Sequence, residues 1–193
     1  GLLGPKTLLA HGVHLDDEEI ALLAERGTSI VHCPESNLKL GSGIARLPEL
    51  LAAGVPLGLG TDGAASNNDL DMWGEMRTAA MIHKGVHEDP TVVPARAVLH
   101  MATSGSARAM GLADRIGSLE AGKCADLILV DLDRLHLTPR YDIYSHLVYS
   151  ANHADVRTVM INGRMIMRDR ELLTLDEAAI KARAREAREH ISR

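Results

Sequence analysis

Two side chains that can do chemistry stand just after short apolar runs in this sequence. His11 follows the run Thr7–Ala10, and Asp62 follows a run that ends at Gly60. Sheets of parallel strands carry their functional residues at the carboxyl ends of the strands, where both side chains would lie. An imidazole and a carboxylate can bind a divalent metal or move protons there. Asp62 also precedes Gly63, and an Asp-Gly pair fits an ordinary turn equally well.

A hydrolytic metal site needs several protein ligands and an open position for water. The sequence holds neither a His-x-His nor a His-Glu-x-x-His pattern, so His11 and Asp62 make only part of such a site. His32 follows a second apolar run, and its side chain could point toward or away from the site. His14 is expected in a loop. The other histidines are expected on helix, loop or tail surfaces: His83, His87, His100, His136, His153 and His190.

The segments that must position these residues alternate between strand and helix patterns. Strands are predicted over residues 7–13, 29–34 and 55–60, from their apolar runs. The polar, Gly-rich stretch 35–43, which follows the second of these strands, is expected to be a loop. With helices between and after the strands, the order βαβαβα predicts parallel strands with helical crossovers. Such an order belongs to an open α/β sheet or to three units of a (β/α)₈ barrel.

The helices have recognisable start and end signals. Asp16 with Glu19 forms a capping-box pattern, and Gly27 stands where a helix would end. A second helix is predicted over 47–53, a third after an Asn68 cap, and a fourth over 94–110. Helical spacing places four methionines in the core: Met72, Met76, Met81 and Met110.

The pattern changes after Gly117. Residues 125–131 and 156–168 are predicted strands, and Asn162-Gly163 between two apolar runs predicts a hairpin with a type I′ turn. Thr174 and Glu177 form a second capping-box pattern. The helix that follows would bear Ile180, Ala184, Ala187 and Ile191 on one face.

Composition excludes several classes of protein. The 193 residues are 46% hydrophobic and 24% charged, which excludes wholesale disorder. The net charge of -5, without a basic cluster, and the 2% aromatic content argue against nucleic-acid binding. No apolar run reaches the roughly 18 residues of a membrane span. The two cysteines, Cys33 and Cys124, form no CxxC motif, which favours a reducing, cytoplasmic location.

Six segments together resemble one family. Residues 9–15 (LAHGVHL), 31–43 (VHCPESNLKLGSG) and 60–68 (GTDGAASNN) closely resemble the amidohydrolase superfamily. The resemblance is to its branch of 5-methylthioadenosine/S-adenosylhomocysteine deaminases and related chlorohydrolases. Residues 117–127 resemble the entry into that superfamily's small β-sandwich domain, and residues 145–149 and 159–164 also resemble the superfamily.

The resemblance implies a metal-dependent hydrolytic deaminase that releases ammonia from the adenine ring of S-adenosylhomocysteine or methylthioadenosine. Asp62 matches the eighth-strand Asp that binds the divalent metal, most often zinc, and can accept a proton. His11 matches the sixth-strand His beside the water that attacks the substrate. Both are therefore the expected catalytic residues. Ser36, Asn37 and Ser66, with Gly63 and Ala64, are expected to line the pocket for the purine nucleoside or to serve as loop scaffolding.

The resemblance also implies an incomplete chain. The family's His-x-His pair, its fifth-strand His and its catalytic Glu are absent, so these residues resemble a C-terminal half. The expected fold is strands six to eight of a (β/α)₈ barrel in residues 1–115, followed by part of a β-sandwich and a C-terminal helix in 116–193. Such a chain is expected to be inactive alone, to need its N-terminal half and to self-associate, as a possible homo-oligomer.

Other functions stay open at this point. One is an aminohydrolase of the same family that acts on guanine, cytosine or a triazine. The other is a half-barrel without catalytic activity, either a remnant or an interaction module.

Overall fold

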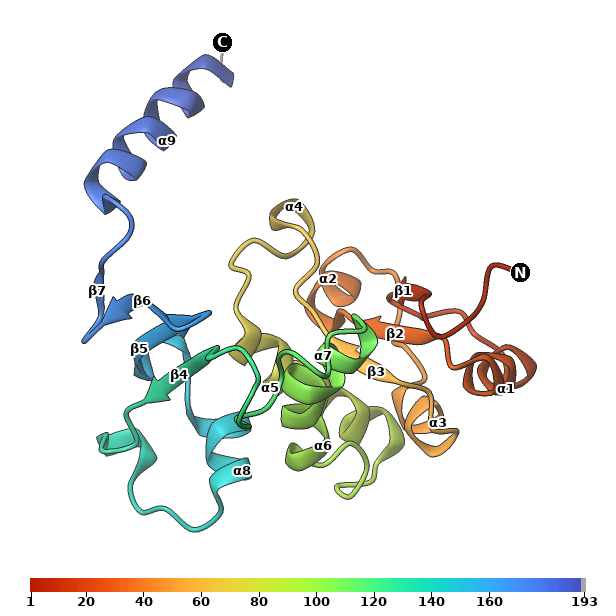
Figure 1. Ribbon diagram of the computed structural model, residues 1–193. Helices are drawn as coiled ribbons and strands as arrows, with labels where there is room; N and C mark the ends of the chain where they lie inside the picture. The colour runs from red at the N-terminus through yellow and green to blue at the C-terminus, as the bar shows by residue number, and fades with distance from the viewer. Residues whose placement is uncertain (192–193) are drawn as a thin grey trace. The chain divides into compact units, whose positions relative to one another are not determined.

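The structure is a computed structural model that describes residues 1–191 (Figure 1). The chain divides into two compact units. The first comprises residues 1–123 and 132–153, and the second comprises 124–131 and 154–193. The boundary expected near residue 115 differs from this division, because residues 116–123 and 132–153 belong to the first unit.

A parallel sheet forms the centre of the first unit. Its strands β1 (Leu8–Ala10), β2 (Ser29–His32) and β3 (Leu57–Leu59) pair in the order β1-β2-β3. Helix α1 (Asp17–Arg26) connects β1 to β2, and α3 (Leu47–Ala52) lies between β2 and β3. The predicted order of parallel strands and helical crossovers is confirmed, with strands shorter than the apolar runs suggested.

Helix α1 begins and ends as its sequence predicts. The Asp16 side chain accepts a hydrogen bond from the Glu19 backbone N–H at 2.8 Å, and the Glu19 side chain accepts one from the Asp16 N–H at 3.0 Å. Gly27 adopts a φ of 65° at the C-terminal cap. That left-handed conformation carries little steric penalty for glycine.

The stretch 35–43 is partly helical, contrary to the predicted loop. Helix α2 (Pro34–Lys39) starts directly after β2, with proline in its first turn, where the missing N–H has no helical partner to lose. A second short helix, α4 (Ala64–Asn67), follows β3. Short helices after both strands were not predicted, because six and four residues are too few for a periodic apolar pattern.

The cap of helix α5 (Met72–His87) lies three residues later than the predicted Asn68 cap. The Asp71 side chain accepts a hydrogen bond from the Trp73 N–H at 2.9 Å and is the actual cap. Asn68, with a φ of 88°, instead ends α4. Of the methionines predicted in the core, Met76 is buried, Met72 is partly buried, and Met81 and Met110 are exposed.

The predicted helix over 94–110 is continuous but changes its winding. It runs as α6 (Ala95–His100), the π-helical segment η1 (Met101–Gly105) and α7 (Ser106–Ala109). The Ser106 hydroxyl donates to the Met101 carbonyl at 2.7 Å and accepts from the Leu59 N–H of β3 at 3.1 Å. The π segment therefore lies directly against β3. The rest of this unit includes η2 (Leu135–Leu137), α8 (Ile143–Ser145) and η3 (His146–Ser150).

One apolar cluster holds the first unit together. The fully buried side chains of Ile30, Leu47, Leu50 and Val98 join β2, α3 and α6. Each such side chain contributes about 1.5–3 kcal/mol through its removal from water. The cluster fixes β1, β2 and β3 side by side, so that the loops after them meet at one edge of the sheet.

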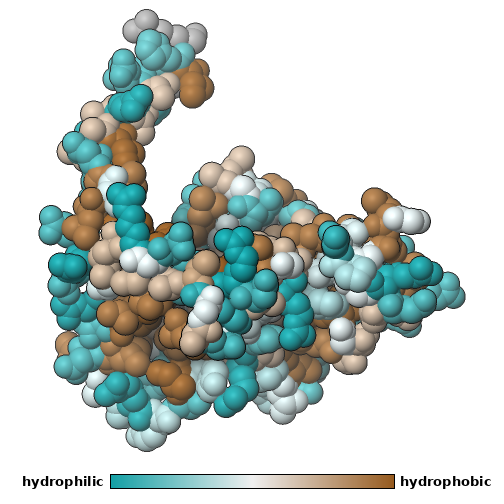
Figure 2. Space-filling model, in the orientation of Figure 1, coloured by the Kyte–Doolittle hydropathy of each residue, from teal (hydrophilic) through white to brown (hydrophobic). Residues whose placement is uncertain are grey.

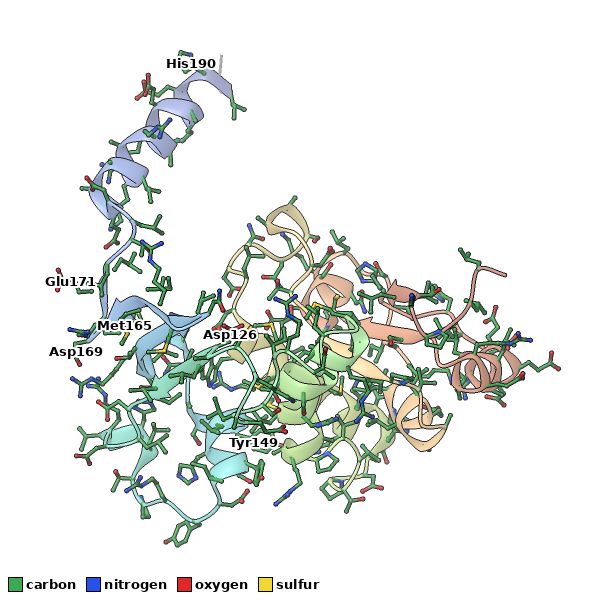
Figure 3. The ribbon with its side chains drawn as sticks, viewed as in Figure 1. Asp126, Tyr149, Met165, Asp169, Glu171 and His190 are labelled. Atoms are coloured by element: carbon green, nitrogen blue, oxygen red, sulfur yellow. The ribbon has the colours of Figure 1, made fainter. Side chains whose placement is uncertain are left out.

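The second unit is an antiparallel sheet followed by a helix. Strands β4 (Leu127–Val130), β5 (Val156–Ile161), β6 (Arg164–Arg168) and β7 (Glu171–Leu172) pair in that order, and the 3-10 turn η4 (His153–Asp155) precedes β5. The predicted hairpin is confirmed, with positive φ at both Asn162 and Gly163. Asp126, labelled in Figure 3, directly precedes β4 and accepts a hydrogen bond from the Asn162 N–H at 2.6 Å. This bond connects the β5–β6 turn to the start of β4.

Helix α9 (Glu177–Ile191) closes the described chain. Asp176, not the predicted Thr174, caps it, because the Asp176 carboxylate accepts from the Ala179 N–H at 2.9 Å. No residue of α9 is buried, and brown apolar atoms alternate with teal polar ones along it in Figure 2. Among residues 1–191, no helix is long and apolar enough to cross a membrane.

Candidate functional site

His11 and Asp62 both lie just past the carboxyl ends of the strands. His11 directly follows β1, and Asp62 is three residues beyond β3. Each has a left-handed backbone, with φ of 69° for His11 and 59° for Asp62. That conformation is uncommon for residues other than glycine and is held only where the surrounding structure determines it. The strand ends therefore position both side chains tightly.

Two hydroxyl groups hold the Asp62 carboxylate. Its Oδ2 accepts hydrogen bonds from Ser66 Oγ at 2.6 Å and from Ser36 Oγ at 2.8 Å. These bonds, and a third from the Gly63 backbone N–H, lower the pKa of Asp62 below its ordinary value. The side chain is therefore an anion at neutral pH with a restricted orientation.

The imidazole of His11 has a buried partner. Its Nδ1 lies 2.8 Å from Oδ1 of Asn37, and only 2% of Asn37 is exposed. With the amide oxygen as acceptor, Nδ1 is the donor in this hydrogen bond. The backbone N–H of His11 donates to the Val31 carbonyl at 2.9 Å and ties this residue to the next strand.

The structure brings all five predicted site residues together in two groups. His11 binds Asn37, and Asp62 binds Ser36 and Ser66. Ser36 and Asn37 are 1% and 2% exposed, and both come from α2. Ser66 is partly buried, on α4.

His32 is buried in the interior and contacts a histidine of α5. It is 2% exposed, and its Nε2 lies 3.3 Å from Nε2 of His83 on α5. The prediction that His83 is on the surface is wrong, because His83 is fully buried where α5 packs. Burial lowers the pKa of His32 to about 3 and of His83 to about 4, so both rings are neutral. The spacing of His83 from the buried Met76, Ala79 and Ala80 is the signal that could have placed it on the inner face.

Sequence reasoning missed a polar group next to the site. Glu75 on α5 is fully buried, and Asn67 and Glu35 are hydrogen-bonded to it. Burial and the charge of Glu35 raise the pKa of Glu75 to about 8. The only signal in the sequence is that Glu75 lies within the apolar face of α5, where a carboxyl needs polar partners.

The donors present fit part of a metal site. An ionised carboxylate and a neutral imidazole nitrogen are both ordinary zinc ligands or partners of a bound water. Within residues 1–191, no group of three His, Cys, Asp or Glu side chains is placed to hold a metal ion. The described residues thus offer one anionic donor and one neighbouring imidazole, not a complete ligand set.

A search of family models decides the relationship. The model described as "Amidohydrolase family" matches residues 1–166. The chain belongs to the amidohydrolase family. Among curated members, a 5-methylthioadenosine/S-adenosylhomocysteine deaminase from Moorella thermoacetica is 57% identical over 94% of this chain and 42% of its own length. Another from Syntrophobacter fumaroxidans is 54% identical over 96% of this chain and 42% of its own.

Solved amidohydrolase structures match the whole fold. A zinc-bound structure called an adenosine deaminase, from Xanthomonas campestris, superposes with a TM-score of 0.97 at 48% identity. The superposition covers 100% of this chain and 44% of the chain in that structure. A zinc complex of atrazine chlorohydrolase from Arthrobacter aurescens superposes with a TM-score of 0.87 at 33% identity, over 93% and 40% of the two chains. These 193 residues therefore span less than half the length of the amidohydrolases they match.

Proposed function

We propose that this chain supplies part of the active site of a zinc-dependent hydrolytic deaminase acting on purine nucleosides such as methylthioadenosine or S-adenosylhomocysteine. The observation that carries the proposal is the pair of residues at the strand ends: an ionised Asp62 held by two hydroxyls, and His11 with its Nδ1 bound to Asn37. The deaminase relatives at 54% and 57% identity support the substrate class.

In this proposal Asp62 binds the metal and accepts a proton during the reaction. A zinc ion, when bound, would lower the pKa of a water to about 7 and so provide a nucleophile at neutral pH. Nε2 of His11 would orient the attacking water and stabilise the charge that develops on the substrate. Ser36 and Asn37 act through the hydrogen bonds they make to Asp62 and His11. Ser66, which is partly buried, both binds Asp62 and borders the substrate.

The remaining ligands would come from a segment that the relatives possess and these 193 residues do not contain. We assign β1, β2 and β3 to the sixth, seventh and eighth strands of a (β/α)₈ barrel. The second unit then corresponds to part of the family's small β-sandwich domain. The parallel order β1-β2-β3 with helical crossovers supports this assignment. The free thiols of Cys33 and Cys124 fit the reducing cytoplasm proposed for such an enzyme.

Two other functions are weaker candidates. A triazine or other aminohydrolase activity has the support of the chlorohydrolase structure, but at 33% identity against 48–57% for the deaminases named above. A module without catalytic activity would have no use for the strained backbones of both His11 and Asp62.

The deciding experiment joins this chain to the N-terminal part of the Moorella relative that it does not match. We expect the hybrid to bind one zinc per chain and to release ammonia from methylthioadenosine and S-adenosylhomocysteine in preference to guanine, cytosine and atrazine. The 193-residue chain alone, assayed in parallel with zinc, should release none above a chelator-treated blank. A folded, zinc-loaded hybrid that deaminates none of these substrates would reject the proposal.

A further inference from the structure

A cluster of polar side chains, with the buried Glu75 at its centre, lies next to the two helices that carry the hydroxyl donors of Asp62. It consists of Glu35 at the start of α2, Asn67 at the end of α4, and Glu75 and Thr78 on α5; we call it the carboxyl–amide cluster. Helix α2 contacts both α4 and α5 (Figure 1). None of these four residues touches the substrate in the function proposed above.

One amide joins the two carboxyl groups of the cluster. Asn67 Nδ2 donates to Glu75 Oε1 at 2.7 Å and lies 3.5 Å from Glu35 Oε2. The backbone N–H of Glu35 donates to Glu75 Oε2 at 3.3 Å. Thr78 Oγ donates to Glu35 Oε1 at 3.0 Å. Glu75 is fully buried, so each of its oxygens has a protein partner in place of water.

The cluster adjoins the Asp62 site in the sequence itself. Ser36 immediately follows Glu35, and Ser66 immediately precedes Asn67. Both serine hydroxyls donate to the same oxygen of Asp62, from two different helices. The two helices must therefore keep a fixed separation for both bonds to form, and the Asn67–Glu75–Glu35 contacts span that separation.

Helix α5 is shaped to receive the Glu35 carboxylate. A Cβ atom on Gly74 would lie 2.8 Å from Glu35 Oε1 and 3.1 Å from Oε2. Any larger residue at position 74 would displace that carboxylate. Charge is also consistent with the arrangement: burial raises the pKa of Glu75 to about 8, so this carboxyl group is largely neutral at pH 7 where it lies beside Glu35.

We infer that Asn67 and Glu75 are positioning residues for Asp62: through the carboxyl–amide cluster they hold α2 and α4 at the separation at which Ser36 and Ser66 both bind the Asp62 carboxylate. The catalytic consequence rests on the proposed function, whereas the effect on α2 does not. Partners in the shell around metal ligands typically change metal affinity or activity by about 10–100-fold when they are removed.

The test is an isosteric pair of substitutions. Asn67→Asp keeps the side-chain oxygen that accepts from the Leu70 N–H but replaces the donor with an oxygen that faces two carboxyl groups. Asn68→Asp makes the same change of charge one residue later, where the side chain binds Lys39 and the φ of 88° suits Asp as well as Asn. A charge effect alone would appear in both variants.

Hydrogen–deuterium exchange in the 193-residue chain gives the first measurement and needs neither zinc nor substrate. Asn67→Asp should speed exchange in residues 34–42, which are distant in sequence. Asn68→Asp should not speed it, because the new carboxylate can still bind Lys39 of α2. Adding Glu75→Gln to Asn67→Asp gives position 75 an amide that can donate to the new carboxylate, and should restore part of the protection. Equal exchange in all variants, or a double variant no better than Asn67→Asp, would overturn the inference.

The hybrid enzyme gives the second measurement. Asn67→Asp should weaken zinc binding, measured by competition with a chelator, by about 10-fold or more and lower kcat with little change in KM. In a Ser36→Ala/Ser66→Ala background the same substitution should have no further effect, since the hydroxyls through which it acts are gone. A full additional loss in that background would overturn the inference. An inactive hybrid with the expected exchange pattern would reject the proposed function only.

Discussion

At the scale of single residues, hydrogen bonding orients the two central side chains and keeps one of them ionised. Asp62 is kept ionised by Ser36, Ser66 and the Gly63 N–H, and His11 has its Nδ1 bound to Asn37. Neither property depends on zinc. A metal or a water arriving at the site would meet preformed donors, which avoids the reorganisation that a mobile site would require.

Asp62→Asn should abolish activity in the hybrid enzyme, whereas His14→Asn should lower it less than about threefold. The amide cannot accept a proton and is a poor metal ligand, and activity losses for such groups run to about 10²–10⁴-fold. His14 is exposed, three residues past His11, and serves as the matched control. Steady-state kinetics with the zinc content of each variant decide the result. Similar losses in the two variants would show that the site has been wrongly assigned.

The buried ionisable groups predict a stability maximum near pH 6.5. Histidines in the unfolded chain have a pKa near 6.5, but burial lowers the pKa of His32 to about 3 and of His83 to about 4 in the folded chain. As pH falls below 6.5 the unfolded state takes up protons that the folded state cannot, so stability is lost at up to about 1.4 kcal/mol per pH unit for each ring. Glu75 acts in the opposite sense, because its pKa of about 8 makes stability fall as pH rises from 4.5 to 8.

Urea unfolding midpoints between pH 4 and pH 8 measure this maximum. Below pH 6.5 two histidines oppose one glutamate, so the histidines should prevail, and above 6.5 the glutamate should act alone. The control is the double variant His32→Gln/His83→Gln. In it the loss of stability below pH 6.5 should become smaller, while the loss above pH 6.5 should stay the same. If the double variant loses as much stability below pH 6.5 as the parent, that loss comes from other groups.

At the scale of elements, the π-helical segment η1 sets how closely the helix over residues 95–109 approaches β3. A Cβ on Gly105 would lie 2.6 Å from the Leu57 carbonyl and 2.9 Å from the His100 carbonyl. Both neighbours are backbone atoms, which cannot rotate away. Gly105 is therefore required for helix and strand to pack, and β3 leads directly to Asp62.

Gly105→Ala should destabilise the chain by about 1–3 kcal/mol, the usual effect of overpacking. Gly85→Ala, on α5 with no atom within 4 Å of the added methyl, should instead stabilise it by about 0.5–1 kcal/mol, because alanine favours the helix more than glycine does. Chemical denaturation of both variants measures the difference. A Gly105→Ala chain as stable as the parent would mean that η1 can move away from β3 freely.

At the scale of the whole molecule, the parallel sheet has two unpaired edges within the described residues. β1 and β3 each pair with β2 only. Parallel sheets in proteins are normally covered on both faces and continued by further strands. Leu8 of β1 is already 45% exposed, and unpaired strand edges attract other chains.

We expect the 193-residue chain to self-associate, with a light-scattering mass that rises with concentration. Co-expression with the unmatched N-terminal part of the Moorella relative should reduce association and confer zinc binding together, because the same strands would cover the edges and complete the ligand set. A chain that stays monomeric and melts cooperatively without that partner would show that the sheet edges need no cover.

Features that depend on neighbours in the sequence were predictable from the sequence alone. The Asp16–Glu19 capping box, the Gly27 cap, the Asn162-Gly163 turn and the order of strands and helices are all local, set by backbone preferences and by apolar periodicity. His11 and Asp62 were also predictable as candidates, since a residue that follows a parallel strand must lie at its carboxyl end.

Only the tertiary structure determined which side chains meet across the sheet. Ser36 and Ser66 meet at Asp62 from helices 26 and 4 residues away in the chain, and Asn67 meets Glu75 from a different helix. The burial of His83 and the assignment of residues 132–153 to the first unit have the same cause. Such contacts depend on how helices pack on the strands, and that packing follows from burying one shared apolar core, a property that no short stretch of sequence contains.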